Sequence, residues 1–248
     1  MIPRRRLVSL EVTPLGLQAA TDQVLVWARA SESRTVCAAN VHMVMEAHDH
    51  PAYATVVNGA DLVLPDGMPL VWGLRLLGQR GAARACGPDL TLEVCRRAAR
   101  EGLSVGFYGA TEPVLAALAT RLSAQCPGLR ITYAFAPPFR PLDEAEQSAI
   151  REAIRASGAR ILFVGLGCPK QEAWMARERA HLPAVLLGVG AAFDFHAGTL
   201  PRAPRWMQRT GLEWTYRLAQ EPRRLWKRNA KHNPRYLGLL GIQVLRGR

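Results

Sequence analysis

The sequence predicts an α/β fold: a Rossmann-like, mostly parallel sheet flanked by helices, with a basic helical appendage at the C-terminal end. Three observations predict it. Short apolar runs of the length of buried strands recur along the first 200 or so residues. Segments of helical period separate these runs, as expected of parallel strands joined by crossover helices. Beyond about residue 204 the runs stop, and Trp, Arg and Tyr recur at helical spacing.

The predicted strands cover residues 35–39, 61–64, 104–108, 130–135, 160–164 and 184–189. Helices are predicted between them by apolar periodicity, by proline in a first turn and by glycine after a last turn. They cover residues 14–30, 41–49, 88–100, 113–125 and 143–157. We therefore expect an α/β domain over residues 1–200 and a basic amphipathic helical appendage over residues 201–248.

Charge is concentrated in the predicted appendage. Of the formal net charge of +12, residues 202–248 hold +10, from 12 Lys and Arg residues against Glu213 and Glu221. Such a tail indicates an acidic partner: a phosphate-bearing ligand, an anionic membrane surface or nucleic acid. The longest apolar stretches are shorter than the roughly 20 residues that span a bilayer, so any membrane contact should be peripheral. No apolar segment follows Arg4-Arg5-Arg6, so a signal peptide is not expected. The five cysteines include no CxxC pair, which suits a reducing cytoplasm.

Polar or glycine-rich residues follow five of the predicted strands. Asn40 follows the first, Asp66 the second and Gly109 the third, and the segments "GLGCPKQE" and "GVGAAFDF" follow the fifth and sixth. Because ligands gather at the carboxyl ends of parallel strands, these residues predict a nucleotide-sized crevice. "GLGCPK" lacks the third glycine of a dinucleotide fingerprint and is not a Walker A loop. Gly109 would let backbone amides approach a diphosphate, or would simply form a tight turn.

Asp66, in "PDGMPL", has two interpretations. It could cap a helix that begins near Gly67, a common use of Asp at a strand-to-helix turn. It could instead be a general base at the carboxyl edge of the sheet, placed to remove a proton from a hydroxyl. Position alone slightly favours the cap.

No convincing metal cage is found in the sequence. Asp-x-Asp is absent, and His48 and His50 lack the further ligands that a metal would need, so both are predicted to lie on the surface. We expect no metal and no other cofactor. A diphosphate that leaves during catalysis would then be stabilised by arginines and helix N-termini.

Five ordered blocks add a more specific signal: "ANVHMVMEAHDHPAYATVVNGADLVLPDGMPLVW", "RACGPDL", "FYGA", "LFVGLGCPKQEAW" and "GVGAAFDFHAGTLPRAPRWMQRTGLEWTYRLAQEPRRLWKR". Together, over about residues 35–236, they resemble the WecG/TagA/CpsF family of bacterial glycosyltransferases, family 26. The resemblance implies an inverting, metal-independent hexosyltransferase. It would move N-acetylmannosamine or a related sugar from a UDP-sugar to a polyprenyl-diphosphate-linked saccharide, in teichoic acid, common antigen or exopolysaccharide synthesis. It also implies a cytoplasmic protein, peripheral on the inner face of the plasma membrane, and leaves homo-oligomer formation open.

The resemblance also implies roles for residues. Asp66 becomes the catalytic base, and the donor and nucleotide would be bound by Asn40, Arg84, Gln171 and Asp194. The lipid diphosphate would be bound by arginines of the tail, namely Arg217, Arg223, Arg224 and Arg228. The aromatic residues Trp206, Trp214, Tyr216 and Trp226 suit a membrane interface or packing against the α/β body. Ala38 departs from the family, which often has Thr at this active-site position, so the identity of the donor transfers less readily.

Two other functions fit parts of the sequence. The basic tail alone would also fit a phosphate-binding or nucleic-acid-binding protein without catalysis, whose affinity would fall steeply with salt. Against it, the arginines alternate with Trp and Leu at amphipathic spacing, and no nucleic-acid motif is recognised. A nucleotide-sugar oxidoreductase or epimerase would need a dinucleotide fingerprint and usually a Tyr-x-x-x-Lys pair, and neither is present. We therefore expect no nucleic acid as a partner.

Overall fold

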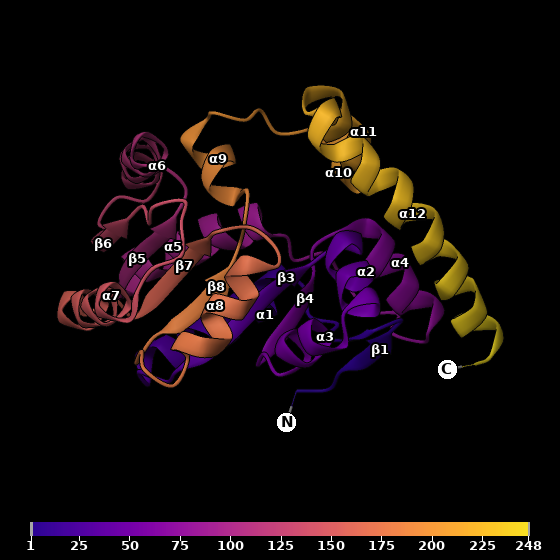
Figure 1. The fold of residues 1–248 in the computed structure, drawn as a ribbon, viewed down its shortest axis with the longest axis horizontal. Helices are drawn as coiled ribbons and strands as arrows, with labels where there is room; N and C mark the ends of the chain where they lie inside the picture. Colours follow the sequence, from indigo (N-terminus) through magenta and orange to yellow (C-terminus); the bar gives the residue numbers. More distant parts are fainter. Residues whose placement is uncertain (1, 248) are drawn as a thin grey trace. The chain divides into compact units, whose positions relative to one another are not determined.

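The computed structural model describes residues 2–247 and confirms the α/β fold (Figure 1). A six-stranded parallel sheet has the order β4-β3-β8-β7-β5-β6, and a separate antiparallel hairpin has the order β1-β2. The strands are β1 (Arg5–Leu7), β2 (Leu10–Val12), β3 (Arg34–Ala39), β4 (Leu62–Pro65), β5 (Ser104–Gly109), β6 (Arg130–Phe135), β7 (Ile161–Gly165) and β8 (Val185–Gly188). All six predicted strands are confirmed, each within one residue of its predicted bounds.

One or two helices separate successive strands of the six-stranded sheet, and within the described residues only helices follow β8. The helices are α1 (Leu17–Arg29), α2 (Val41–Asp49), α3 (Pro51–Asn58), α4 (Met68–Leu76), α5 (Gly87–Glu101), α6 (Glu112–Gln125), α7 (Glu144–Ser157), α8 (Lys170–Glu178), α9 (Ala192–Ala197), α10 (Arg205–Arg209), α11 (Glu213–Gln220) and α12 (Pro222–Leu245). The five predicted helices are all present, and α2 has its predicted bounds.

One helix start was predicted wrongly. The sequence places Pro14 in the first turn of a helix, whereas α1 begins only at Leu17. Thr13 explains the difference, because its backbone N–H donates to the carbonyl of Val63 at 2.8 Å and its hydroxyl oxygen accepts from the N–H of Val63 at 3.3 Å. These bonds to β4 keep the chain extended at the position where a helix cap was expected.

The chain forms two compact units. Unit 1 contains the described residues up to Leu17, Ala38–Cys86 and the described residues from Arg202 onward. Unit 2 contains Gln18–Cys37 and Gly87–Pro201. In unit 2, strand pairs β3–β8, β8–β7, β7–β5 and β5–β6 are parallel, and Phe107 of β5 packs on Phe163 of β7 with ring centroids 5.4 Å apart.

In unit 1, helix α12 packs along α2 and α4 (Figure 1). The buried face of α12 consists of Leu225, His232, Tyr236 and Leu240. The Tyr236 hydroxyl donates to the carbonyl of Pro69 at 3.0 Å, next to the start of α4. A Cβ atom added to Gly73 of α4 would lie 2.8 Å from Leu7 and 3.0 Å from the Tyr236 hydroxyl oxygen. The absence of a side chain at Gly73 therefore lets α4, α12 and β1 approach closely.

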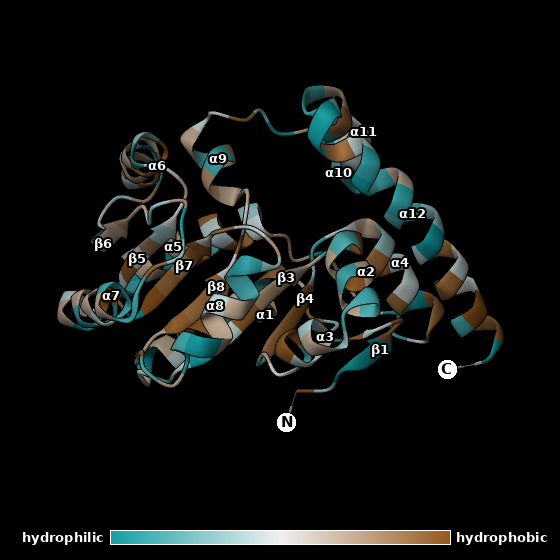
Figure 2. Cartoon of the chain, in the orientation of Figure 1, coloured by the Kyte–Doolittle hydropathy of each residue, from teal (hydrophilic) through white to brown (hydrophobic). Residues whose placement is uncertain are grey.

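The exposed side of α12 changes character along its length. Figure 2 shows a hydrophilic start and a more hydrophobic second half. Leu237, Ile242 and Leu245 are exposed in that second half, and Trp226 is exposed near the start. Within residues 2–247, no helix combines the length and the apolar character needed to cross a bilayer.

Candidate active site

Asp66 lies where β4 ends. The strand is fully buried through Leu62, Val63 and Leu64, and Asp66 is half-buried after Pro65. The backbone N–H of Asp66 donates to the carbonyl of Ala39 at 2.8 Å, which joins the end of β4 to the end of β3. The N-cap of α4 is Gly67, so Asp66 is not the cap residue. Its carboxyl group is thus held at a strand end without the structural role proposed as the alternative.

The surroundings of Asp66 change its acidity. Loss of solvent contact raises its pKa to about 6, and the negative charge of Glu213 acts in the same direction. The positive charges of Arg84, Arg217 and Arg202 act in the opposite direction. A carboxyl group with a pKa near 6 is ionised at neutral pH and is a stronger base than an ordinary aspartate, as general-base catalysis requires.

Arg84 connects Asp66 to the C-terminal helices. Its Nε donates to the backbone carbonyl of Asp66 at 2.7 Å. Its Nη1 donates to Oε1 of Gln208 on α10 at 3.3 Å, and its Nη2 forms an ion pair with Glu213 on α11. The side chains of Arg84 and Glu213 are 16% and 21% exposed, so this ion pair is largely shielded from water.

Asn40 stands beside Asp66 in the same unit, since it directly follows Ala39. It is the N-cap of α2, and its side-chain oxygen accepts a hydrogen bond from the N–H of Met43 at 3.2 Å. Ala38, at the position of the family's usual Thr, is buried. Asn40 therefore has a structural role in the protein alone, and its predicted contact with the donor remains a prediction.

The tail arginines differ in their surroundings. Arg217 on α11 lies 3.5 Å from Glu221, and its charge acts on Asp66. Arg224 pairs with the same glutamate at 2.9 Å and is largely exposed, as is Arg223. Arg228 is half-buried, and its charge acts on His42. The positive charge of Arg217 is thus brought to Asp66, while that of Arg228 reaches the start of α2.

Three further predicted site residues belong to unit 2. Gly109 ends β5 with a φ of 128°, and a Cβ there would lie 2.6 Å from the backbone of Gly165. Gln171 is buried; its Oε1 accepts from the N–H of Gly190 at 3.1 Å, and its Nε2 donates to Glu172 at 2.7 Å. Asp194 on α9 is half-buried, and its carboxylate accepts from the hydroxyl of Thr199 at 3.3 Å. These contacts shape the loops after β5, β7 and β8.

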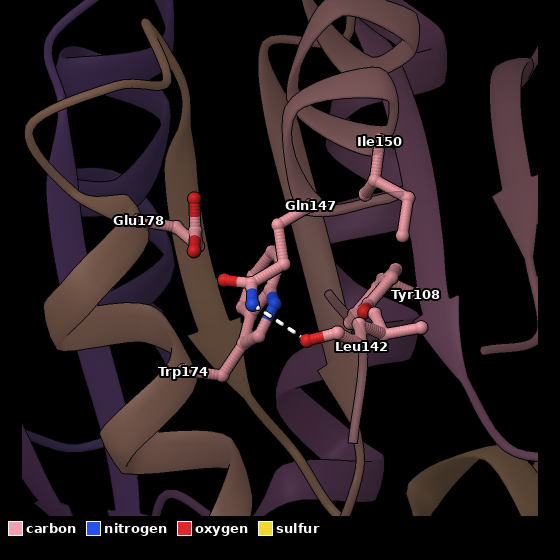
Figure 3. Close-up of a pocket in the computed structure, with 6 residues that line it drawn as sticks. All are labelled: Tyr108, Leu142, Gln147, Ile150, Trp174 and Glu178. Atoms are coloured by element: carbon pink, nitrogen blue, oxygen red, sulfur yellow. Dashed lines mark hydrogen bonds between the residues drawn. The ribbon is translucent and has the colours of Figure 1, made fainter. Parts of the chain in front are cut away.

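Unit 2 also contains a small pocket (Figure 3). Its lining residues are Tyr108, Leu142, Gln147, Ile150, Trp174 and Glu178, and Gln147 donates to the carbonyl of Leu142 at 2.9 Å. The empty volume between these side chains, open solvent included, is about 170 Å³. None of the predicted site residues lines it. This pocket is not the nucleotide crevice that the sequence predicts.

Helices α2 and α12 bring together three residues that could bind a metal, namely His42, Glu46 and His232, whose ligand atoms lie within 4.8 Å of one another. Burial, followed by the charge of Arg228, lowers the pKa of His42 to about 4. The same positive charge would oppose a bound cation. We therefore regard this cluster as part of the contact between α2 and α12. His48 and His50 are exposed, as predicted.

Comparison with known proteins shows the family to which the chain is related. Residues 5–248 match the glycosyl transferase WecG/TagA/CpsF family. The chain belongs to this family. A relative from Bacillus spizizenii (strain ATCC 23059 / NRRL B-14472 / W23) is 34% identical over 194 residues, which cover 78% of this chain and 73% of the relative. That protein is described as an N-acetylglucosaminyldiphosphoundecaprenol N-acetyl-beta-D-mannosaminyltransferase.

Family membership confirms the resemblance seen in the sequence. Sequence reasoning nevertheless missed Gln208 and Glu213, which lie 124 and 129 residues from their partner Arg84. Glu213 falls inside one of the blocks typical of the family, in "GLEW". Nothing in its local pattern separates it from a glutamate in the first turn of an exposed helix, where a negative charge is favourable in any case.

Proposed function

We propose that this glycosyltransferase moves a hexosyl group, N-acetylmannosaminyl or a close relative, from a UDP-sugar to a polyprenyl-diphosphate-linked saccharide. The proposal places it in the synthesis of a cell-surface polysaccharide. The single observation that carries the chemistry is Asp66, a half-buried carboxyl group at the end of β4 whose pKa is raised to about 6. The name of the Bacillus relative supports the choice of sugar and acceptor.

In the proposed reaction, Asp66 takes the proton of an acceptor hydroxyl as that oxygen attacks the anomeric carbon. The bond from this carbon to the diphosphate oxygen of UDP breaks, and UDP leaves with the electron pair. A single displacement of this kind inverts the anomeric centre and forms no covalent enzyme intermediate. We assign donor and nucleotide contacts to Asn40, Arg84, Gly109, Gln171 and Asp194.

Arginines would stabilise the negative charge of the two diphosphates. Guanidinium groups bind phosphate oxygens through paired, charge-assisted hydrogen bonds, so they can replace a divalent ion at a leaving diphosphate. Arg217 is the best supported of them, because its charge already acts on Asp66. Arg223, Arg224 and Arg228 would extend this positive surface along α12 toward the lipid-linked acceptor.

The proposed acceptor is held in a membrane, and the C-terminal helices offer suitable side chains. Trp206, Trp214 and Trp226 are 60%, 42% and 54% exposed. Indole rings are favoured at the boundary between headgroups and acyl chains. Together with the basic charge, these exposed rings support a peripheral position on the inner face of the plasma membrane.

The test is a panel of UDP-sugars incubated with an N-acetylglucosaminyl-diphosphate lipid and analysed by mass spectrometry. We expect one UDP-hexosamine to give an acceptor heavier by one sugar, with an inverted linkage in the NMR spectrum. Product formation should be the same in EDTA and in added Mg²⁺. Absence of product with every donor would refute the proposed transfer, and a product formed only with Mg²⁺ would refute metal independence alone.

A further inference from the structure

The guanidinium group of Arg84 is shared between Asp66 and the C-terminal helices. One side holds the backbone carbonyl of Asp66 through Nε, and the other side is held by Gln208 and Glu213. Gln208 is itself fixed, since its Nε2 donates to the carbonyl of Ala203 at 2.7 Å. The orientation of Arg84 beside Asp66 therefore depends on residues of α10 and α11.

The charges that face Asp66 are those of Arg84, Glu213, Arg217 and Arg202. Three are positive, and Glu213 is the single carboxylate among them. Without Glu213, no carboxylate would offset the positive charge that Arg84 exerts on Asp66. An aspartate paired with an arginine is a weak base, because the cation stabilises the ionised form.

We propose that Glu213 is a positioning residue for the transfer reaction: it holds Arg84 on the backbone of Asp66 and neutralises its charge, so that the Asp66 carboxylate stays basic enough to accept a proton. The inference rests on the proposed function of Asp66 as general base. It gives α11 a part in catalysis that is separate from binding lipid or membrane.

The decisive variant is Glu213→Gln. Glutamine has the same shape and can still accept a hydrogen bond from Arg84, so the loss is mainly one of charge. Two effects lower the pKa of Asp66: the negative charge of Glu213 is removed, and the positive charge of Arg84 is no longer offset. The acidic limb of the profile of kcat/KM against pH should therefore move to lower pH by about one unit. The plateau should fall, because a weaker base accelerates proton transfer less.

Two further variants separate charge from general disturbance of the site. Glu213→Asp keeps the carboxylate and should restore the wild-type acidic limb. Asp49→Asn removes a carboxylate that pairs with Arg235 and Lys231 on α12, without contact to Arg84, and should leave the limb in place. If Glu213→Gln leaves the acidic limb unmoved, or moves it no further than Asp49→Asn does, the inference is overturned.

A second readout does not depend on turnover. Carboxyl ¹³C NMR of protein labelled at aspartate follows the titration of Asp66 directly, with Asp66→Asn used to assign its signal. The midpoint should lie lower in Glu213→Gln than in the wild type, and equal midpoints would refute the inference. If wild-type protein forms no product with any donor, the proposed function fails, while the NMR titration still decides whether Glu213 controls Asp66.

Discussion

The backbone N–H of Asp66 is hydrogen-bonded to the backbone carbonyl of Ala39 at 2.8 Å. This bond ties together the ends of two neighbouring strands and fixes the backbone that bears the carboxylate. A group fixed in this way needs little reorganisation when it accepts a proton, which favours its use as a general base.

Replacing Asp66 by Asn should lower kcat by about 100-fold or more, the usual contribution of a general base. Binding of the UDP-sugar, measured by calorimetry, should be largely unchanged because the carboxylate acts on the acceptor. The thermal midpoint should not fall, since an ionised carboxylate with a raised pKa costs the fold stability at neutral pH. Wild-type turnover in this variant would return Asp66 to a structural role.

The pH dependence of the wild type follows from the pKa of Asp66, about 6. Only the ionised carboxylate can accept a proton, so kcat/KM should rise with pH below about 6 and level off above it. An ordinary aspartate, with a pKa near 3.9, would give a flat profile over pH 5–8. Initial rates measured with donor and acceptor both well below their KM values report the free enzyme and distinguish the two cases.

Gly73 tests the packing of α12 on α4. A methyl group there would lie within 3.0 Å of Leu7 and Tyr236, so Gly73→Ala should lower the free energy of unfolding by about 1–3 kcal/mol, as overpacking generally does. Gly238, on α12, has no atom within 4 Å of the added Cβ position. Gly238→Ala should therefore raise stability slightly through helix propensity. Urea denaturation of both variants compares them, and equal effects would contradict the packing described for Gly73.

Acid should weaken the contact between α2 and α12. The pKa of His42 is lowered to about 4, first by burial and then by the charge of Arg228. The folded state thus holds His42 neutral, while the unfolded chain protonates it near 6.5. Between pH 6.5 and 4 the free energy of unfolding should fall by about 3 kcal/mol as pH falls.

His42→Gln should remove most of this pH dependence, and His48→Ala, an exposed neighbour on the same helix, should leave it unchanged. Urea titrations at pH 4.5 and 7 measure the difference. A wild-type protein equally stable at both values would show that protonation of His42 is not opposed by the fold.

The sequence predicted the sheet well because five of its six strands are buried on both faces, with β6 as the exposed exception. Leu62, Val63 and Leu64 form an uninterrupted apolar run of a kind that helices on a protein surface rarely have. The hairpin of β1 and β2 was missed because each strand has three residues and the turn at Val8 and Ser9 lacks the usual Asn-Gly or Asp-Gly pair. Val8 also adopts a positive φ of 58°, which is rare for a β-branched residue.

Local pattern was less informative about the site. The position of Asp66 at a strand end could be predicted from local pattern, but its proposed role as base and those of the tail arginines came from the family resemblance. The connection of Arg84 to Gln208 and Glu213 could not be predicted, since it depends on how helices far along the chain pack against the first strands. Thr13 is a similar case: its bonds to Val63 override a helix start that looks favourable in isolation.

The contacts of the hairpin limit when unit 1 can finish folding. Gln243, near the end of α12, accepts a hydrogen bond from the N–H of Val8 at 2.8 Å and donates one to the carbonyl of Arg6 at 2.9 Å. During synthesis on the ribosome, Gln243 is added 235 residues after Val8, so the turn at Val8 is made before this partner exists. Unit 1 can therefore reach its final form only after Gln243 has been synthesised and α12 has folded back onto the hairpin.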